Sequence, residues 1–473
     1  MFGIPYTRQG WIDAEMAKAA ARDPFGHRLH VILGLTWLFL SVGPVTVVEF
    51  AVALLWGLGV LRAYIVHRTW RSVGCHPTMW VVLLGALWQM ASIAWSPDRA
   101  QGWVEVSRSR WIAVMWLNWS ILPYRGAMIT ALVLGFLAAN GAQVLNAAGH
   151  RLNVGWMVLD RNPDRNPGWW QPVVAGSMLT AALGLHLPAA VMGSGRTRWL
   201  AMLGAAVTTA GVLVTGSRGA WLASAALILI VIAVGVVWWF KGWKHRSAAP
   251  NGSGWKHRSA VREEPLKSSK ARALPGRALL PIALVALAGV VLWLTAGDAI
   301  VRRYDNARDE IRRVIDHRDY TTWTGARVLM AKVALRAAAA HPVRGVGAGG
   351  YQKWGNDHRK PDEAGYIHVH AHNTYLHIVA TTGLVGLGLF LTAMGMGLYG
   401  ALRGLGARMG TYAAGPGFAL LGLLLAGMTD VIQLNVQTVA LMYVLMGLNL
   451  WPRPAEGRMP AWDRAAWGKP FPR

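Results

Sequence analysis

Long apolar stretches recur along this chain and constrain its fold more than any other feature. Each is close to the ~20 residues that an α-helix needs to cross a bilayer. The predicted spans lie at 28–42, 44–66, 76–95, 102–122, 124–146, 171–192, 198–215, 219–240, 278–296, 372–401, 412–428 and 431–450. The chain is 54% hydrophobic and only 15% charged, with a mean hydropathy of +0.32. The sequence therefore predicts an all-α polytopic membrane protein, a single transmembrane domain over residues 1–473 with about twelve transmembrane helices.

Lys and Arg are unevenly distributed between the predicted spans. They mark the connecting segments 67–75, 194–198, 241–277 and 403–408, which fall on the same side as the basic N- and C-terminal tails. Because basic loops are retained in the cytoplasm, we expect both termini to be cytoplasmic. The loops 147–170 and 297–371 then face the opposite side, which is the periplasm in a Gram-negative cell.

The formal net charge of +25 is explained by these cytoplasmic loops and by contact with anionic membrane lipids, so no nucleic-acid partner is expected. Cys75 is the only cysteine, which excludes an internal disulfide and a multi-cysteine metal site. We expect no cleavable signal peptide, because the first residues are polar and no small-residue cleavage pattern follows the first apolar run. No P-loop is present, so the energy for any transfer must reside in the donor.

Two connecting loops contain internal repeats. In the loop 241–277, Gly242–Ala248 recurs as Gly254–Ala260. Its basic, Ser-, Pro- and Gly-rich composition is typical of a flexible cytoplasmic linker. In the loop 147–170, an Asp-Arg-Asn-Pro sequence begins at Asp160 and again at Asp164. Asp and Asn-Pro favour turns, so we expect two successive turns there, with a cation held by the two aspartates as the alternative.

The largest polar interruption runs from about Arg302 to His372 and is dense in arginine and histidine. Arginine suits phosphate and diphosphate groups, and histidine suits proton transfer near neutral pH. Arg327 opens an amphipathic run to Ala340 that predicts a helix, which must end near His341 because a proline follows. We therefore expect a partly helical periplasmic loop, 297–371, that carries out catalysis on a phosphorylated lipid at the membrane surface.

His372 lies at the outer start of the tenth predicted span, with Asn373 as a candidate N-cap. Nearby arginines would keep this histidine neutral and available as a general base. A hydrogen-bonded interfacial histidine is one alternative. A zinc site is another, since His368, His370 and His372 alternate along the chain, but no carboxylate pattern accompanies them and we expect no metal.

Three further arginines are placed near or within predicted spans. Arg218 lies at the outer end of the eighth span, near a helix N-terminus that favours anions; an arginine reaching to lipid head groups is the alternative. Arg108 and Arg110 lie within the fourth span, where charges are costly and face a cavity or a partner. They are expected either to pair with Glu105 or to bind a lipid diphosphate or an acidic glycan.

Gly345, Gly347 and Gly350 match the pattern Gly-x-Gly-x-x-Gly. A dinucleotide site is rejected, because a helix precedes the pattern and the loop faces a compartment without NAD. A tight turn that lets the backbone approach a ligand fits better. Gly345, Gly347 and the adjacent Tyr351 are therefore expected to bind substrate, as is Asn373.

Four motifs, in this order, resemble the O-antigen ligase and polymerase superfamily: Ser217-Arg218-Gly219-Ala220, Gly325-Ala326-Arg327, His341-Pro342-x-x-Gly345-x-Gly347 and His372-Asn373-Thr374-Tyr375-Leu376. The segment Thr382–Gly386 fits the same pattern, and the similarity covers about residues 170–400. Within the superfamily the chain most resembles O-antigen ligases. These enzymes transfer a completed O-antigen glycan from undecaprenyl diphosphate to a sugar of the lipid A–core.

The resemblance implies a metal-independent, inverting glycosyltransferase of the inner membrane, without a cofactor and with a periplasmic active site. It assigns activation of the acceptor hydroxyl to His372, and binding of the diphosphate to Arg218 and Arg327, which would stabilise its charge as the glycosidic bond breaks. Arg303 or Arg312 could take the place of Arg327. The implied partners are undecaprenyl-diphosphate-linked O-antigen and the lipid A–core acceptor.

Three other functions compete with this interpretation. An O-antigen polymerase shares the donor but extends another glycan. Protein O-oligosaccharyltransferases commonly carry a larger outer domain after the histidine loop, and none is visible in this sequence. A lipid-glycan flippase predicts charges throughout the spans and broken helices near the midplane. The polar residues here concentrate on one outer face, which favours an enzyme.

Overall fold

The computed structural model describes residues 9–159, 165–247, 301–302, 304–402 and 411–450. Every regular element in these ranges is helical, as the sequence predicts. The α-helices are α1 (Gln9–Arg22), α2 (Pro24–Leu40), α3 (Val45–Leu61), α4 (Ala63–Gly74), α5 (Pro77–Ser92), α6 (Arg99–Val106), α7 (Val114–Trp119), α8 (Arg125–Leu152), α9 (Pro172–Met192), α10 (Gly195–Val214), α11 (Arg218–Ser247), α13 (Trp323–Ala340), α14 (Tyr351–Asp357), α15 (Thr374–Leu402), α17 (Gly415–Ala426) and α18 (Val436–Leu450). Residues 304–317 are also helical. Short 3-10 helices include η2 (Ile93–Trp95), η3 (Ser107–Ala113), η4 (Leu122–Tyr124), η5 (Gly155–Met157) and η6 (Tyr412–Ala414).

Several of these helices can cross a membrane. By length and composition, the described residues contain 6 spanning helices, or up to 7 if the bent pair α3–α4, with its angle of 108°, counts as one span. The six are Pro77–Trp95, Leu122–His150, Pro172–Met192, Gly195–Val214, Arg218–Trp238 and Thr374–Leu402. Two shorter apolar helices are Tyr412–Ala426 and Val436–Leu450. A multi-pass protein is thus confirmed, whereas about twelve full spans are not; the predicted span 278–296 lies outside the described residues.

Two segments differ from the sequence prediction. The predicted span 102–122 is not one helix but the succession of α6, η3 and α7. The predicted loop 67–75 is largely the end of α4. This helix buries Val66, Thr69 and Val73 while Arg68 is exposed, which is the pattern of an amphipathic surface helix. The basic residues led us to expect a loop, although the buried positions follow a helical period.

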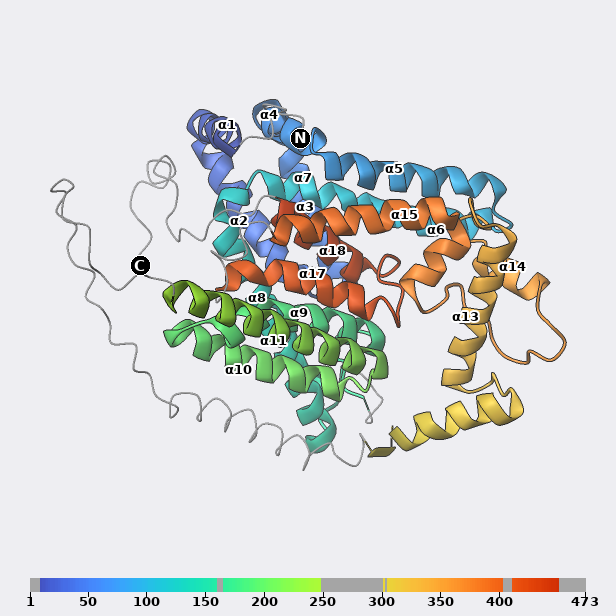
Figure 1. The fold of residues 1–473 in the computed structure, drawn as a ribbon. Helices are drawn as coiled ribbons and strands as arrows, with labels where there is room; N and C mark the ends of the chain where they lie inside the picture. Colours follow the sequence, from blue (N-terminus) through green and yellow to red (C-terminus); the bar gives the residue numbers. More distant parts are fainter. Residues whose placement is uncertain (1–8, 160–164, 248–300, 303, 403–410, 451–473) are drawn as a thin grey trace.

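The centre of the molecule is α9, which is buried along nearly its whole length. It packs against α10, α11 and α17, while α5 packs along α15 on the other side of the bundle (Figure 1). This arrangement gathers the starts of α11 and α15 and the turn between α17 and α18 at one end of the bundle. That end is where the polar segment predicted from the sequence is attached.

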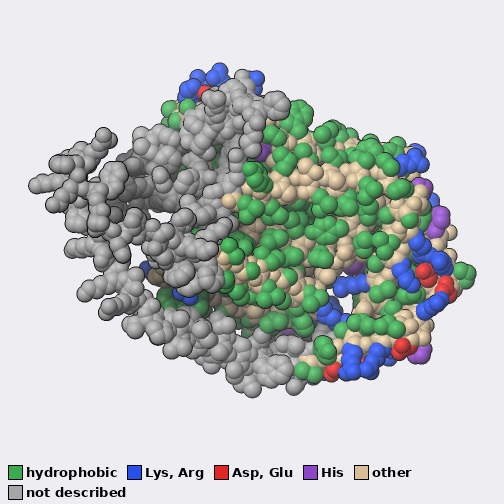
Figure 2. Space-filling model, in the orientation of Figure 1, with side chains coloured by type: hydrophobic (Ala, Val, Ile, Leu, Met, Phe, Trp, Pro, Cys, Tyr) green, Lys and Arg blue, Asp and Glu red, His purple; other side chains and the backbone are tan. Residues whose placement is uncertain are grey.

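Beyond this end, the polar segment forms a small unit of its own, which contains α13 and α14 and is called the outer unit or outer segment below (Figure 1). α13 and α14 share a second apolar core that includes Leu329, Val333 and Ile367. The predicted helix from Arg327 to Ala340 is confirmed, and it begins earlier, at Trp323, with the Thr322 hydroxyl accepting a cap hydrogen bond from Gly325 N at 3.0 Å. Figure 2 shows hydrophobic side chains over the bundle, with Lys, Arg, Asp, Glu and His gathered around this unit.

Candidate active site

The start of α11 is pressed against the turn between α17 and α18. Gly216 adopts a left-handed conformation, with φ at 64°, and α11 begins two residues later at Arg218. At Gly219 a side chain is excluded, because a Cβ atom would lie 2.0 Å from Thr429 Oγ1. The Ser-Arg-Gly-Ala motif therefore brings Arg218 next to the Thr429–Asp430 turn.

Arg218 is held by protein groups rather than by solvent. Its Nη1 donates to Glu310 Oε2 at 3.3 Å and to Thr324 Oγ1 at 3.2 Å, and its side chain is 27% exposed. Burial favours the neutral form of Glu310, but hydrogen bonds from Thr324 and Arg218, and the charge of Arg218, outweigh it and lower the pKa of this carboxyl. Glu310 is therefore ionised at neutral pH. The alternative of an arginine that reaches only to lipid head groups is wrong.

Arg327, on α13, belongs to a cluster of charged residues that also contains Arg218, Glu310, Asp430 and Arg165. Burial lowers the pKa of its guanidinium, and the charges of Arg218 and Arg165 act in the same direction. The charges of Asp430 and Glu310 oppose this effect. Asp430 is 3% exposed, and burial raises its pKa to about 6, although the Val431 N–H and Arg327 favour the ionised form. The charges of Arg327 and Asp430 therefore act on one another in a region where Asp430 is buried and Arg327 is partly buried.

His368, His370 and His372, at the end of the polar segment, lie together, and the charge of Arg327 acts on all three. The ring centroids of His370 and His372 are 4.3 Å apart, and those of His368 and His372 are 5.2 Å apart. Burial, followed by the charges of Arg327 and His368, lowers the pKa of His372 to about 4. His372 is thus neutral at pH 7, as predicted, although burial contributes more than the arginine does. Its Nδ1 is buried and has no hydrogen-bond partner among the described residues.

The backbone at His372 has an unusual conformation. It has a φ of 48°, which is uncommon for residues other than glycine, and such conformations cluster at functional sites. Its N–H points to His370 Nδ1 at 3.4 Å. Although the three imidazoles are neighbours, the described residues contain no group of three or more His, Cys, Asp or Glu side chains placed to hold a metal ion.

The residues after His372 tie it to the Asp430 turn. Asn373 Oδ1 accepts from the N–H groups of Tyr375 and Leu376, both at 3.0 Å, which confirms the predicted N-cap. Its Nδ2 donates to Met428 O at 2.8 Å, and Thr374 Oγ1 donates to Asp430 O at 2.9 Å. The His-Asn-Thr motif therefore fixes the position of His372 relative to Asp430. Since both polar ends of the Asn373 amide are engaged in this way, the structure gives this side chain a capping role rather than a substrate contact.

Part of this chain, including most of the site, matches a known protein family. The family model described as O-antigen ligase matches residues 200–391. Residues 200–391 are thus similar to the O-antigen ligase family. They include Arg218, Arg327 and His372, so the resemblance carried by the four motifs is confirmed. No curated protein matches the chain.

Within residues 200–391, the glycine-rich turn has a different role from the one predicted. Gly345 and Gly347 are buried, with φ angles of 66° and 96°. A Cβ at Gly345 would lie 2.3 Å from the Thr381 carbonyl carbon, and the Gly347 N–H donates to Thr381 O at 2.8 Å. The turn therefore lets the backbone approach α15, and not a ligand. The prediction that Gly345 and Gly347 bind substrate is therefore wrong.

Tyr351 and Glu105 are also structural. Tyr351 is completely buried and its hydroxyl donates to Met330 O at 2.6 Å, so it packs α14 against α13 and does not reach substrate. Glu105 Oε2 accepts from Gly349 N at 3.0 Å, and its Oε1 lies 3.4 Å from His377 Nε2. The predicted pairing of Glu105 with the arginines of the fourth span is therefore wrong.

Among the described residues, no contact joins Arg108, Arg110 or Arg312 to the cluster. Arg110 pairs with Glu49 of α3, and the charge of Arg108 interacts with the same two residues. Arg312 is exposed on the helical residues 304–317. Arg303, as well as Asp160 and Asp164 of the proposed cation site, lies outside the described residues.

Three members of the cluster were missed from the sequence: Glu310, Asp430 and Arg165. Asp430 carried a usable signal, since it is the only acidic residue between 412 and 450, and a lone carboxyl in an apolar region usually has a function. Glu310 is one of several acidic residues in its helix and had no such signal. Arg165 lies in the second Asp-Arg-Asn-Pro repeat, which we interpreted as a turn or, through its aspartate, as part of a cation site.

A pocket opens between α5, α15 and α18. Its lining is mostly apolar, including Val82, Leu389 and Met394, with His377, Gln89 and Gln433 as polar members. Most lining residues come from the spanning helices α5 and α15, and others from α18, so the pocket lies within the bundle. A long apolar chain with a polar end would fit such a lining. Figure 2 separately shows a hollow bordered by Lys and Arg side chains between the bundle and the outer unit.

Proposed function

We propose that this protein is an O-antigen ligase that transfers O-antigen polysaccharide from undecaprenyl diphosphate to the lipid A–core at the periplasmic face of the inner membrane. The proposal is supported by the contacts that bring Arg218 to the start of the helix carrying Arg327 and that bring the residue after Asn373 to the Asp430 turn, and by the effect of Arg327 on His372. Two cations and a neutral imidazole are what displacement of a diphosphate by a hydroxyl requires.

The proposed reaction is an inverting displacement. The acceptor hydroxyl attacks the anomeric carbon of the donor glycan, and the bond from that carbon to the phosphate oxygen breaks. The electron pair leaves with undecaprenyl diphosphate, and the hydroxyl proton passes to the free imidazole nitrogen of His372. Arg218 and Arg327 stabilise the charge that develops on the leaving group. The positive charge comes from these side chains, which supports a metal-independent reaction.

The low pKa of His372 fits a site that awaits an anion. Without donor, burial and, after it, the charge of Arg327 lower the pKa of His372 to about 4, which makes the imidazole a weak base. A bound diphosphate would offset the charge of Arg327, so the pKa of His372 should rise when the donor is present. The imidazole then becomes a stronger base once donor and acceptor are both in place.

The test is a lipopolysaccharide gel from the host with this gene deleted, together with an assay of undecaprenyl-linked glycan. A ligase predicts bare lipid A–core and an accumulation of long chains on undecaprenyl diphosphate. Lipid A–core that carries single repeat units would instead identify an O-antigen polymerase. Wild-type lipopolysaccharide in the deletion strain would overturn both functions.

A further inference from the structure

Asn166 is fixed to two spanning helices by an unusual number of hydrogen bonds. Its N–H donates to Val214 O at 2.8 Å, and its Nδ2 donates to Gln143 O at 2.6 Å. Gln143 Nε2 donates to Asn166 O at 2.8 Å, and Asn146 Nδ2 donates to Asn166 Oδ1 at 3.0 Å. Gln143 and Asn146 are both buried. Every backbone and amide polar group of Asn166 therefore contributes to this clamp.

The clamp sets the position of the preceding residue, Arg165. Val214 is the last residue of α10, and only three residues separate it from Arg218. Asn166 is bonded to Val214, so Arg165 is held at the same edge of the cluster as the Ser-Arg-Gly-Ala motif. The Nε atom of Arg165 is buried without a hydrogen-bond partner in the part of the chain that the structure describes. This N–H therefore lacks an acceptor, which a buried donor group ordinarily has.

The charges of the cluster indicate what that acceptor is. Arg218 has Glu310 as a partner, and the charge of Asp430 acts on Arg327. Arg165 forms no ion pair with a described carboxylate, yet its charge acts on Arg327 and lowers the pKa of that guanidinium. Three arginines that converge in a partly buried site repel one another unless an anion joins them. A diphosphate, with more charge than a monophosphate, matches three cations better than two.

We propose that Arg165 is a third cation of the donor site, positioned by the Asn166 clamp to bind an oxygen of the lipid diphosphate. The inference rests on the proposed function, because it names a further residue of the same site. Its specific consequence is selectivity for a diphosphate over a monophosphate. A residue with only a structural role would not change that selectivity.

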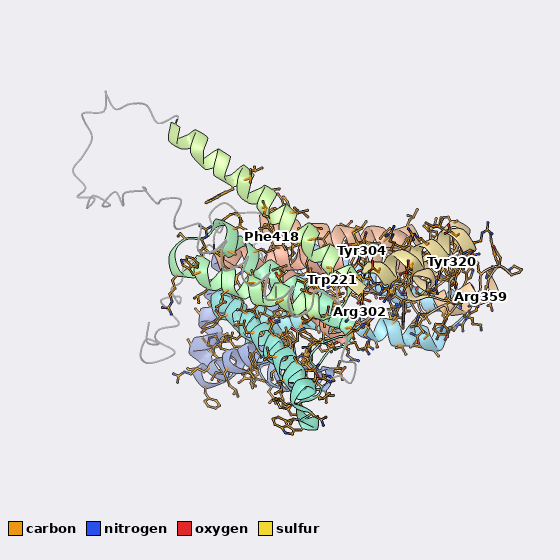
Figure 3. The ribbon with its side chains drawn as sticks, turned by 90° about the horizontal axis from the view of Figure 1, so that it is seen from below. Trp221, Arg302, Tyr304, Tyr320, Arg359 and Phe418 are labelled. Carbon is orange, nitrogen blue, oxygen red and sulfur yellow. The ribbon has the colours of Figure 1, made fainter. Side chains whose placement is uncertain are left out.

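The experiment measures binding of farnesyl diphosphate and farnesyl monophosphate to the purified full-length protein in lipid nanodiscs. Four proteins are compared: wild type, Arg165→Ala, Arg165→Gln and Arg359→Ala. Arg359 is the matched control, since it is exposed, donates to Asn356 Oδ1 at 3.1 Å, and lies far along the outer unit from Trp221 of α11 (Figure 3). Arg165→Gln retains a long polar side chain and so protects the test if Arg165→Ala does not fold.

We expect both Arg165 variants to bind the diphosphate ~10-fold or more weakly, with a much smaller change for the monophosphate, because one charged hydrogen bond is lost. Arg359→Ala should bind as wild type does. Equal diphosphate affinity in folded Arg165→Gln and wild type, or an equal loss for both ligands, would overturn the inference. If wild type itself binds neither ligand, the proposed function fails first, so the two failures are distinguishable.

Discussion

Glu310 Oε2 accepts a hydrogen bond from Arg218 Nη1 at 3.3 Å. A carboxylate of the outer segment is therefore bound to one of the two arginines that we propose bind the donor diphosphate. The same carboxylate accepts from Thr324 N at 3.0 Å, at the start of α13. It therefore links the start of α11 to the helix that carries Arg327. Before Arg218 can bind a phosphate oxygen fully, this contact must be shared or broken.

Replacing Glu310 by Gln tests this competition. The amide oxygen can still accept from Thr324, but the negative charge that competes for Arg218 is removed. We expect the donor to bind more tightly, by up to about fivefold, since partly exposed ion pairs of this kind contribute about 0.2–1 kcal/mol. The measurement is the affinity for farnesyl diphosphate. Weaker binding in a folded variant would show instead that Glu310 orients Arg218 for the donor.

Replacing His372 by Ala tests the proposed base. Transfer should fall by about 10²–10⁴-fold, the usual contribution of general acid–base catalysis, while donor binding and the unfolding temperature stay near those of wild type. The assay is ligation of a lipid-linked glycan to lipid A–core by the purified variant. His358→Ala is the control, because this histidine stacks on Trp354 at 4.2 Å in the outer unit, away from the proposed base. Near-normal transfer by the His372 variant would remove the assigned role.

Acidification should destabilise the protein through its histidine cluster. Burial lowers the pKa of His370 to about 3 and that of His372 to about 4, from an ordinary 6.5. Between pH 6.5 and 4 the unfolded chain therefore binds more protons at these positions than the folded chain does, and their contribution to stability falls as the pH falls. Asp430 acts in the opposite direction, because its pKa of about 6 is raised from 3.8.

The pKa shifts of the two histidines are together larger than that of Asp430, so their effect on stability exceeds the opposite effect of Asp430. We therefore expect the unfolding temperature to fall as the pH is lowered from 7 to 4.5. Thermal unfolding in detergent at several pH values measures the effect. His370→Gln should reduce the loss on acidification, and Asp430→Asn should increase it. An identical pH dependence in wild type and His370→Gln would mean that the cluster does not control acid stability.

The sequence predicted the parts of the site that depend on local chemistry. The helix that carries Arg327 follows from its apolar period and the proline after His341, and the Asn373 cap follows from the side chain alone. Arg218 was placed correctly near a helix N-terminus. These features need only neighbours along the chain, and the order of the motifs supplied the family.

The parts that were missed depend on contacts between distant segments. The glycine-rich pattern indicated a close backbone approach, but only the fold shows that the approached group is Thr381, in α15. Asn166 looked like a turn residue until Gln143 and Val214 were found bonded to it. Glu105 was assigned to the nearest arginines in the sequence, whereas its partner Gly349 comes from the outer segment. Spacing along the chain carries no information on such pairings.

The docking of the glycine-rich turn onto α15 gives a last prediction, on stability. Gly383 interrupts α15 with a φ of 69°, and a Cβ there would lie 2.1 Å from Val343 O. The break frees α15 backbone groups to bond the turn, for example Leu384 N to Pro342 O at 2.8 Å. Gly383→Ala adds both a strained conformation and a clash with backbone, which cannot move away as a flexible side chain would.

We therefore expect Gly383→Ala to destabilise the protein by about 1–3 kcal/mol from backbone strain alone, with the clash in addition. Gly388→Ala is the matched control. It lies in the same helix, a Cβ there meets nothing within 4 Å, and alanine favours a helix by up to about 1 kcal/mol over glycine. Thermal unfolding of both variants in detergent separates the two positions. If they unfold at the same temperature, the turn does not need the break in α15, and the contact between Gly345 and Thr381 must form without it.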